Sequence, residues 1–168
     1  MTIYSTHFDS PVGTLLALAK RTNGTNGGEA ITTLHMLGAK HEPLQNEAWI
    51  DAPTLPIFLQ LRQQLSEYFA GSRRTFDIAL APEGTDFQRA VWDALTKVPF
   101  GQTRTYGQQA EMIGNPKAVR AVGAANGRNP IGIVIPCHRV IGSSGKLTGY
   151  AGGLDKKEYL LKLEGIVF

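Results

Sequence analysis

The chain has 168 residues, of which 42% are hydrophobic and 18% charged, so it can form a folded core and is not a disordered chain. Its single cysteine excludes an internal disulfide and a cysteine-rich zinc site, and it suits a reducing compartment. Residues 1–84 carry six Lys/Arg against eight Asp/Glu, whereas residues 85–168 carry eleven against six, so the basic character belongs to the C-terminal half. This asymmetry favours a polyanionic partner there, with an ordinary solvated surface as the alternative.

The N-terminal segment indicates where the protein resides, and the spacing of the histidines indicates whether it binds a metal. Polar residues interrupt the first 20 positions and no stretch approaches 18 apolar residues, so neither a signal peptide nor a membrane span is indicated. We therefore expect a cytoplasmic protein. His7, His35 and His41 lack the spacing of metal ligands, and no metal site is expected.

The pattern of the first half predicts a small antiparallel sheet packed on one helix. Asn-Gly turns indicate a flexible surface loop at 21–29, and residues 38–53 are polar and irregular. Apolar residues at helical spacing predict a helix at 55–70 that ends at Gly71. Nothing in this half is typical of a reactive site. The strands are expected at 3–8, 14–19 and 30–37.

The second half begins with helix signals. Two T-x-x-Q capping boxes, at 85–88 and 105–108, each start a helix, and the second of these helices is expected to run to Ile113. The pair Asn115-Pro116 matches an N-cap followed by proline at the first helical position, so a further helix is expected at 116–126. A final helix is expected to be capped by Asp155.

The helices at 105–113 and 116–126 have helix-turn-helix proportions. Without long polar side chains, the second helix could hardly read a base sequence in the major groove, so we predict a DNA-binding helix without sequence specificity. Its small residues indicate that something approaches the backbone closely, and tight packing in the core is the alternative. The small residues include Ala121 and Gly123, and the cations are Lys117, Arg120 and Arg128.

The only cysteine stands beside a histidine at the end of an apolar run. Residues 131–135 predict a buried strand, and Pro136 fits the first position of a helical turn that would place Cys137 near free backbone N–H groups. Such groups favour the thiolate, which is the nucleophilic form of cysteine. A small buried hydrophobe is the alternative for this residue.

His138 is the candidate base for this thiol. In a continuous strand the two side chains would point to opposite faces, so proton transfer needs a turn or a bridging water. A carboxylate on the other ring nitrogen would help, and the sequence leaves open which one it is. The glycine-rich segment 146–153 suits the lining of a flat pocket, or it is a plain surface loop. The acidic candidates are Asp86, Asp93, Glu111, Asp155, Glu158 and Glu164.

Several motifs of the second half occur in one order, and with PCHRV at 136–140 they resemble the O6-alkylguanine-DNA alkyltransferase family. The resemblance covers 85–168, whereas residues 1–84 are similar only in layout, to the family's small N-terminal domain of ribonuclease H-like shape. The other motifs are FQRAVW at 87–92, PFG at 99–101, YGQ at 106–108, NPKAVRAVG at 115–123, NP at 129–130, TGYAGG at 148–153 and LEG at 163–165.

This resemblance implies an α+β fold in two domains. Residues 1–84, linker included, would form an antiparallel sheet with a helix, and residues 85–168 a mostly helical, winged-helix-like DNA-binding domain that carries the active site. The implied function is DNA repair. The alkyl group of O6-alkylguanine, and of O4-alkylthymine, would move from duplex DNA to the protein's own cysteine in one irreversible turnover.

The resemblance also implies a role for each matching residue of the active site. Cys137 would accept the alkyl group, His138 would act as base through water, and Glu164 would orient His138. Asn129 would brace the turn around the site. Tyr106 would donate a proton toward guanine N3 and crowd the backbone phosphate.

DNA binding is implied in the same way. The helix at 116–126 would lie in the minor groove, and Arg120 would enter the duplex in place of the extruded nucleotide. Some members have serine at the position of Ala151, so a hydroxyl contact to O6 is not expected here, although a backbone N–H contact is. Further DNA contacts are expected from Tyr106, Lys117, Ala121, Gly123 and Arg128. The pocket is expected to be lined by Val140, Tyr150, Ala151 and Gly152.

The implied partner is double-stranded DNA, bound by a monomer without cofactor, metal or membrane, and cooperative binding along DNA is left open. Some members carry zinc in the N-terminal domain, but this chain has no cysteine there. The alternative is a non-catalytic alkyltransferase-like protein that binds DNA damage. Such proteins have tryptophan at the position of Cys137, which argues against it. A thiol hydrolase lacks an evident oxyanion hole here, and the alanine-rich helix disfavours a transcription factor.

Overall fold

The computed structural model describes residues 1–22 and 28–167. The loop predicted at 21–29 falls mostly on residues 23–27, which lie outside the described residues.

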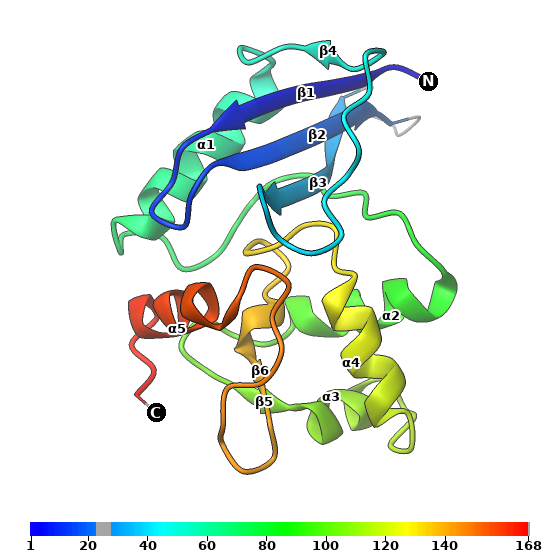
Figure 1. The fold of residues 1–168 in the computed structure, drawn as a ribbon, viewed down its shortest axis with the longest axis vertical. Coiled ribbons are helices and arrows are strands. Elements are labelled where there is room, and N and C mark those ends of the chain that lie inside the picture. Colours follow the sequence, from blue (N-terminus) through cyan, green and yellow to red (C-terminus); the bar gives the residue numbers. More distant parts are fainter. Residues whose placement is uncertain (23–27, 168) are drawn as a thin grey trace.

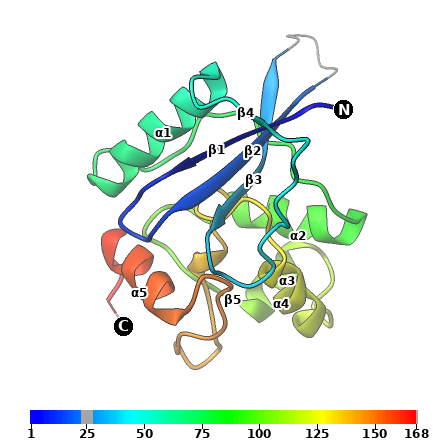
Figure 2. The same ribbon diagram turned by 45° about the horizontal axis from the view of Figure 1, so that its top comes forward.

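The first half is a four-stranded sheet with one helix, α1 (Pro56–Phe69), against one face (Figures 1 and 2). The three predicted strands and the helix are confirmed, and their ends agree to within two residues. A short fourth strand, which was not predicted, pairs in parallel with the first, so the sheet is mixed. In the order β3-β2-β1-β4, the strands are β1 (Ile3–Phe8), β2 (Leu15–Arg21), β3 (Glu29–Met36) and β4 (Ile50–Asp51).

The second half is mostly helical, with a two-stranded parallel ladder. Both predicted capping boxes are present: Thr85 accepts a hydrogen bond from the backbone of Gln88 at 3.1 Å, and Thr105 accepts one from that of Gln108 at 3.1 Å. The helices are α2 (Asp86–Thr96), α3 (Tyr106–Met112), α4 (Val119–Gly127) and α5 (Leu154–Leu163), with a 3-10 turn, η1 (Cys137–Arg139). The ladder strands are β5 (Arg104–Thr105) and β6 (Val140–Ile141).

Two helix starts differ from the prediction. Residues 115–118 form a separate turn closed by a hydrogen bond from the Ala118 N–H to the Asn115 carbonyl, so α4 begins at Val119 and not at 116. Lys117 therefore precedes this helix. Helix α5 begins after Gly153, which has a φ of 101° that suits glycine, and Asp155 lies in its first turn instead of capping it.

The predicted strand at 131–135 is wrong. Its side chains are buried, as expected, but its backbone forms tight turns in which the Ile135 N–H bonds to the Ile131 carbonyl at 3.0 Å. Ile133 has a φ of 69°, which a β-branched residue in a strand does not adopt. Only Ile131 makes a strand-like bridge, to Leu34 of β3.

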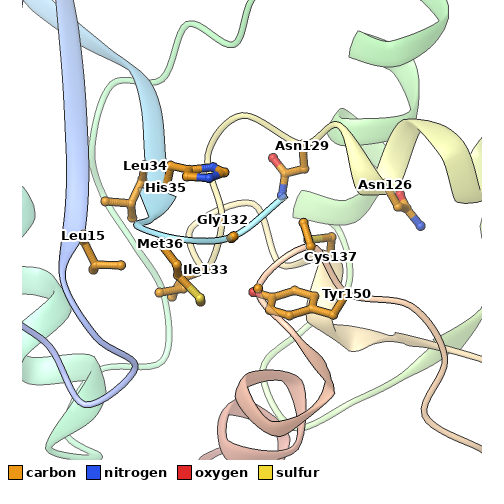
Figure 3. Close-up of a pocket in the computed structure, with 13 residues that line it drawn as sticks. Leu15, Leu34, His35, Met36, Asn126, Asn129, Gly132, Ile133, Cys137 and Tyr150 are labelled. Carbon is orange, nitrogen blue, oxygen red and sulfur yellow. The ribbon is translucent and has the colours of Figure 1, made fainter. Parts of the chain in front are cut away.

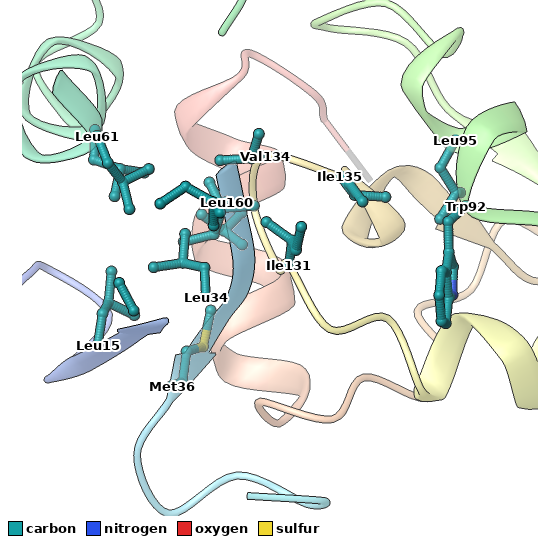
Figure 4. Close-up of a cluster of buried hydrophobic side chains, with 14 of the residues drawn as sticks. Leu15, Leu34, Met36, Leu61, Trp92, Leu95, Ile131, Val134, Ile135 and Leu160 are labelled. Carbon is teal, nitrogen blue, oxygen red and sulfur yellow. The ribbon is translucent and has the colours of Figure 1, made fainter. Parts of the chain in front are cut away.

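One hydrophobic core joins the two halves (Figure 4). Leu34 of β3, Ile131 of the turn segment and Leu160 of α5 pack in the same cluster as Leu61 of α1. The backbone reinforces this junction, because the Leu34 N–H donates to the Pro130 carbonyl at 2.9 Å and the Gly132 N–H to the Leu34 carbonyl at 3.0 Å. The segment that leads to Cys137 is thus anchored to the edge of the sheet. Across the described ranges, none of the helices has the length and apolar character needed to cross a membrane.

Candidate active site

Cys137 is held at the start of the 3-10 turn by the segment before it. Asn129 fastens this segment at both ends, because its amide nitrogen donates to the Ile135 carbonyl at 2.8 Å and its side-chain oxygen accepts from the Ile131 N–H at 3.0 Å. The Cys137 N–H donates back to the Ile135 carbonyl at 2.8 Å. The geometry therefore gives Asn129 the bracing contacts that the resemblance implied.

The thiol of Cys137 is partly buried, and burial decides its protonation. Burial raises the pKa of Cys137, and a hydrogen bond from Asn129 and the charge of Lys157 only reduce this rise. A backbone hydrogen bond at Cys137 also lowers its pKa, as expected from the sequence, but burial outweighs this effect in the resting protein. Cys137 is a thiol at neutral pH and needs a base to become a nucleophile.

His138 and Glu164 form a buried pair beside this thiol. His138 Nε2 lies 2.6 Å from Glu164 Oε2, and both side chains are inaccessible to solvent. An ionised carboxylate can only accept, so Nε2 carries the proton and Nδ1 keeps a free lone pair. Nδ1 is buried without a hydrogen-bond partner among the described residues. Burial lowers the pKa of His138 despite the neighbouring carboxylate, so the ring is neutral and can accept a proton.

Sequence reasoning missed two further partners of the Glu164 carboxylate. Arg139 binds it with two nitrogens, Nε to Oε1 at 2.7 Å and Nη2 to Oε2 at 3.1 Å, and the Tyr68 hydroxyl donates to Oε2 at 2.6 Å. Burial alone would raise the pKa of Glu164, but hydrogen bonds and charge from His138, Arg139 and Tyr68 lower it to about 2. Glu164 is thus the carboxylate partner of His138 that the sequence left undecided. It is ionised, and both of its oxygens accept hydrogen bonds.

Lys157 is a buried cation that sequence reasoning also missed. Its ammonium group donates to the carbonyls of Val140 and Thr148 at 2.6 Å each and of Gly149 at 3.3 Å, which ties the 141–149 loop to α5. Burial lowers the pKa of Lys157 to about 8, while the nearby Cys137 acts in the opposite direction. The lysine remains largely charged at neutral pH and favours a thiolate when one forms.

Two cavities meet at Cys137. The smaller one, of about 40 Å³, lies between the cysteine and the sheet and is lined by Leu34 and Met36 of β3 (Figure 3). The first half therefore builds part of the site, which the sequence gave no reason to expect. Tyr150 and Ala151 line both cavities, and Gly152 lines the smaller one, whereas the fully buried Val140 lines neither.

The larger cavity, of about 420 Å³, leads from Cys137 to the surface beside α4. Tyr106 lines it, with its hydroxyl 3.4 Å from the Thr148 carbonyl, and the ring of Tyr106 faces Gly123. A Cβ at position 123 would lie 3.8 Å from that ring. Lys40, His41 and Arg128 also line this cavity, and the first two come from the N-terminal half.

The exposed face of α4 continues from the mouth of this cavity. Arg120 and Ala121 are exposed on the helix, and Lys117 is exposed in the turn before it. Neither cation forms an ion pair within the described part of the chain. The structure therefore places free positive charge and a small-residue surface next to the entrance to Cys137.

Comparison with known proteins identifies the family of this chain. Family models match both halves: 6-O-methylguanine DNA methyltransferase, ribonuclease-like domain, over residues 3–82, and its DNA binding domain over residues 86–166. Relatives named methylated-DNA–protein-cysteine methyltransferase include one from Methanosarcina acetivorans, 49% identical over 97% of this chain and 99% of the relative. Another, from Mycolicibacterium paratuberculosis, is 53% identical over 93% of this chain and 88% of the relative.

Solved structures give the same match. The crystal structure of Mycobacterium tuberculosis OGT in complex with DNA has a TM-score of 0.82 at 45% identity and covers 98% of this chain and 92% of that one. The structure of the Mycobacterium tuberculosis O6-methylguanine methyltransferase has a TM-score of 0.84 at 47% identity, with 97% and 93% coverage. The chain belongs to the 6-O-methylguanine DNA methyltransferase family.

Proposed function

We propose that this protein repairs alkylated DNA by moving the alkyl group from O6 of guanine, or O4 of thymine, to Cys137. One observation carries this proposal: the only thiol of the chain lies where a cavity from the α4 surface ends, beside a neutral histidine that is held by an ionised carboxylate. The single cysteine also suits a reaction in the cytoplasm, where thiols stay reduced. Each molecule reacts once, because a thioether is not reversed by the groups of this site.

The reaction uses the residues of the site in order. The proton of the Cys137 thiol moves through a water molecule to Nδ1 of His138, while Glu164 stabilises the imidazolium that forms. The sulfur then bonds to the alkyl carbon, and the C–O bond breaks with its electron pair going to O6. Tyr106 protonates N3 of the departing guanine, and the imidazolium proton returns to Tyr106 through solvent. The products are S-alkylcysteine and guanine.

The same proposal assigns α4 to the minor groove of duplex DNA. Arg120 takes the place of the extruded nucleotide, and Ala121 and Gly123 allow the backbone of the helix to approach the DNA. Lys117 and Arg128 bind phosphates. Extrusion of a base costs a few kcal/mol, which contacts in the large cavity offset. We assign DNA binding and chemistry to residues 85–168 and support of the cysteine segment to residues 1–84, acting as a monomer.

Transfer of a labelled methyl group tests this function. After incubation with duplex DNA that contains labelled O6-methylguanine, we expect the label on Cys137 by peptide mass spectrometry, at no more than one equivalent per protein. The Cys137→Ser variant should bind the same duplex without taking up label. Multiple turnovers, or label on another residue, would contradict the mechanism. Tight binding without any transfer would support the non-catalytic alternative instead.

A further inference from the structure

Tyr68 connects the N-terminal half to the relay behind the cysteine. It lies in the last turn of α1, whose end is close to the end of α5 (Figures 1 and 2). Its hydroxyl donates to Glu164 Oε2 at 2.6 Å, and His138 Nε2 lies 2.6 Å from the same oxygen. All three side chains are inaccessible to solvent or nearly so. One carboxylate oxygen therefore accepts from a tyrosine of the first half and from the histidine of the second.

We propose that Tyr68 is a positioning residue of the alkyl transfer, which holds the Glu164 carboxylate that orients His138 and limits how strongly that carboxylate stabilises the imidazolium. This inference rests on the proposed function. It assigns to the N-terminal half a part in the chemistry of the second half, through a contact that spans 96 residues of sequence.

The hydroxyl of Tyr68 can act only as a donor here. Burial, and then the negative charge of Glu164, raise the pKa of Tyr68 far above its usual value, so the hydroxyl keeps its proton. Its ring is fixed by aromatic neighbours, with the ring of Phe76 at 5.4 Å and that of Phe100 at 6.2 Å between centroids. Because this fixed hydroxyl donates to Oε2, the carboxylate stabilises a protonated His138 less strongly than it would without Tyr68.

Other charged and titratable groups also lie around His138 and Glu164. Arg139 of η1 binds both oxygens of the carboxylate, and Lys157 of α5 lies near enough to disfavour a charged histidine. Cys137 and Tyr150 complete the group, and both are neutral at rest because burial raises their pKa. Of these groups, only Tyr68 comes from the N-terminal half.

Removal of the hydroxyl should therefore make His138 more basic. In Tyr68→Phe, Oε2 keeps its contact with His138 but loses a competing donor, so the imidazolium gains stabilisation. A hydrogen bond to a charged group corresponds to a shift of about one pH unit in the titration of its partner. Because His138 must be neutral to take the thiol proton, the acidic limb of the rate profile should move upward by about that amount.

The experiment compares wild type with Tyr68→Phe in two measurements. The first follows His138 by NMR of protein labelled in the imidazole ring, from neutral pH down to the lowest pH at which the fold persists, because burial lowers the pKa of this ring below the usual histidine range. The second follows the single-turnover rate of transfer from a free O6-alkylguanine base over the same range, which avoids any effect on DNA binding. Tyr159→Phe is the matched control, since it removes the same hydroxyl from an exposed position on α5.

We expect the variant to titrate at higher pH and to react roughly tenfold more slowly on the acidic limb, with a similar rate on the plateau. The control should follow wild type in both measurements. An unchanged His138 titration, or a rate reduced equally at every pH, would overturn the inference and leave Tyr68 a structural residue. Failure of wild type to alkylate Cys137 would instead overturn the proposed function, and the NMR titration would still report on the contact.

Discussion

Arg120 is the long cation on the part of α4 that is otherwise small and exposed. Its side chain forms no ion pair among the described contacts, so it is available to a partner. We expect Arg120→Ala to slow transfer from duplex DNA by about tenfold or more, the loss typical of one specific arginine contact. Transfer from a free O6-alkylguanine base should change little, because no nucleotide has to be extruded.

Single-turnover rates on the two substrates measure this difference. Lys162→Ala serves as the control, since it removes an exposed positive charge from α5. If Arg120→Ala slows both substrates equally, the arginine has no part in extrusion. If Lys162→Ala also slows transfer from duplex DNA selectively, the loss reflects the total charge of the protein and not a specific role of Arg120.

The individual residues of the site differ in how far the sequence could predict them. Cys137 and His138 are adjacent, and a motif is enough to find them. Glu164 was predicted only from the family resemblance, because the sequence alone left six carboxylates as candidates for the partner of His138. Tyr68 and Arg139 could not be assigned, since a tyrosine among apolar helix residues and an arginine after a histidine have no local signature of a shared carboxylate. Their contacts are made by packing between distant segments.

Among the elements, α4 combines short length with an exposed surface of small residues. We expect Ala121→Leu to weaken binding to duplex DNA by about tenfold or more, because a bulky group separates the helix backbone from the groove by more than a hydrogen bond can span. The melting temperature should change little, since leucine is almost as good a helix former as alanine and the site is exposed.

Fluorescence titration with duplex DNA and a thermal melt together check this expectation. Ala90→Leu is a suitable control, as Ala90 is exposed on α2. Equal binding by Ala121→Leu and wild type would exclude a close approach of α4 to the DNA.

The elements that were predicted correctly are those with local signals. Both capping boxes act within four residues, and the strands and helix of the first half follow their own periodicity. The prediction of a strand at 131–135 was wrong because the sheet and α5 bury the apolar residues of this segment, although the segment does not itself form a strand ladder. An apolar run without alternation does not distinguish a strand from other buried backbone, and in this segment Ile133 has a positive φ.

At the scale of the whole molecule, the buried relay makes stability depend on pH. The pKa of Glu164 is lowered to about 2 in the fold, so its contribution is present above the unfolded value of about 4.5 and is lost as pH falls toward 2. The pKa of His138 is also lowered, so the unfolded chain takes up that proton first as pH falls below 6.5. Both groups therefore reduce stability in acid.

We expect Glu164→Gln to lower the melting temperature at pH 7 by roughly 10 °C, because it leaves Arg139 buried without its carboxylate. The variant should also lose less stability than wild type between about pH 5 and pH 3, since this titration is gone. Thermal melts across that range measure both effects, and Glu111→Gln on the exposed side of α3 is the control. Parallel pH profiles for Glu164→Gln and wild type would show that the relay does not govern acid stability.

The protonated resting state of Cys137 has a consequence for how long the protein remains usable. Peroxides and stray electrophiles react with thiolates far faster than with thiols. A protein that acts once is lost whenever its cysteine is oxidised or alkylated by a small molecule instead of DNA. Burial keeps this sulfur neutral, and the base that removes its proton is itself buried. Under the proposed single-turnover function, we therefore expect the burial that disfavours ionisation of the thiol also to protect unreacted protein from such side reactions.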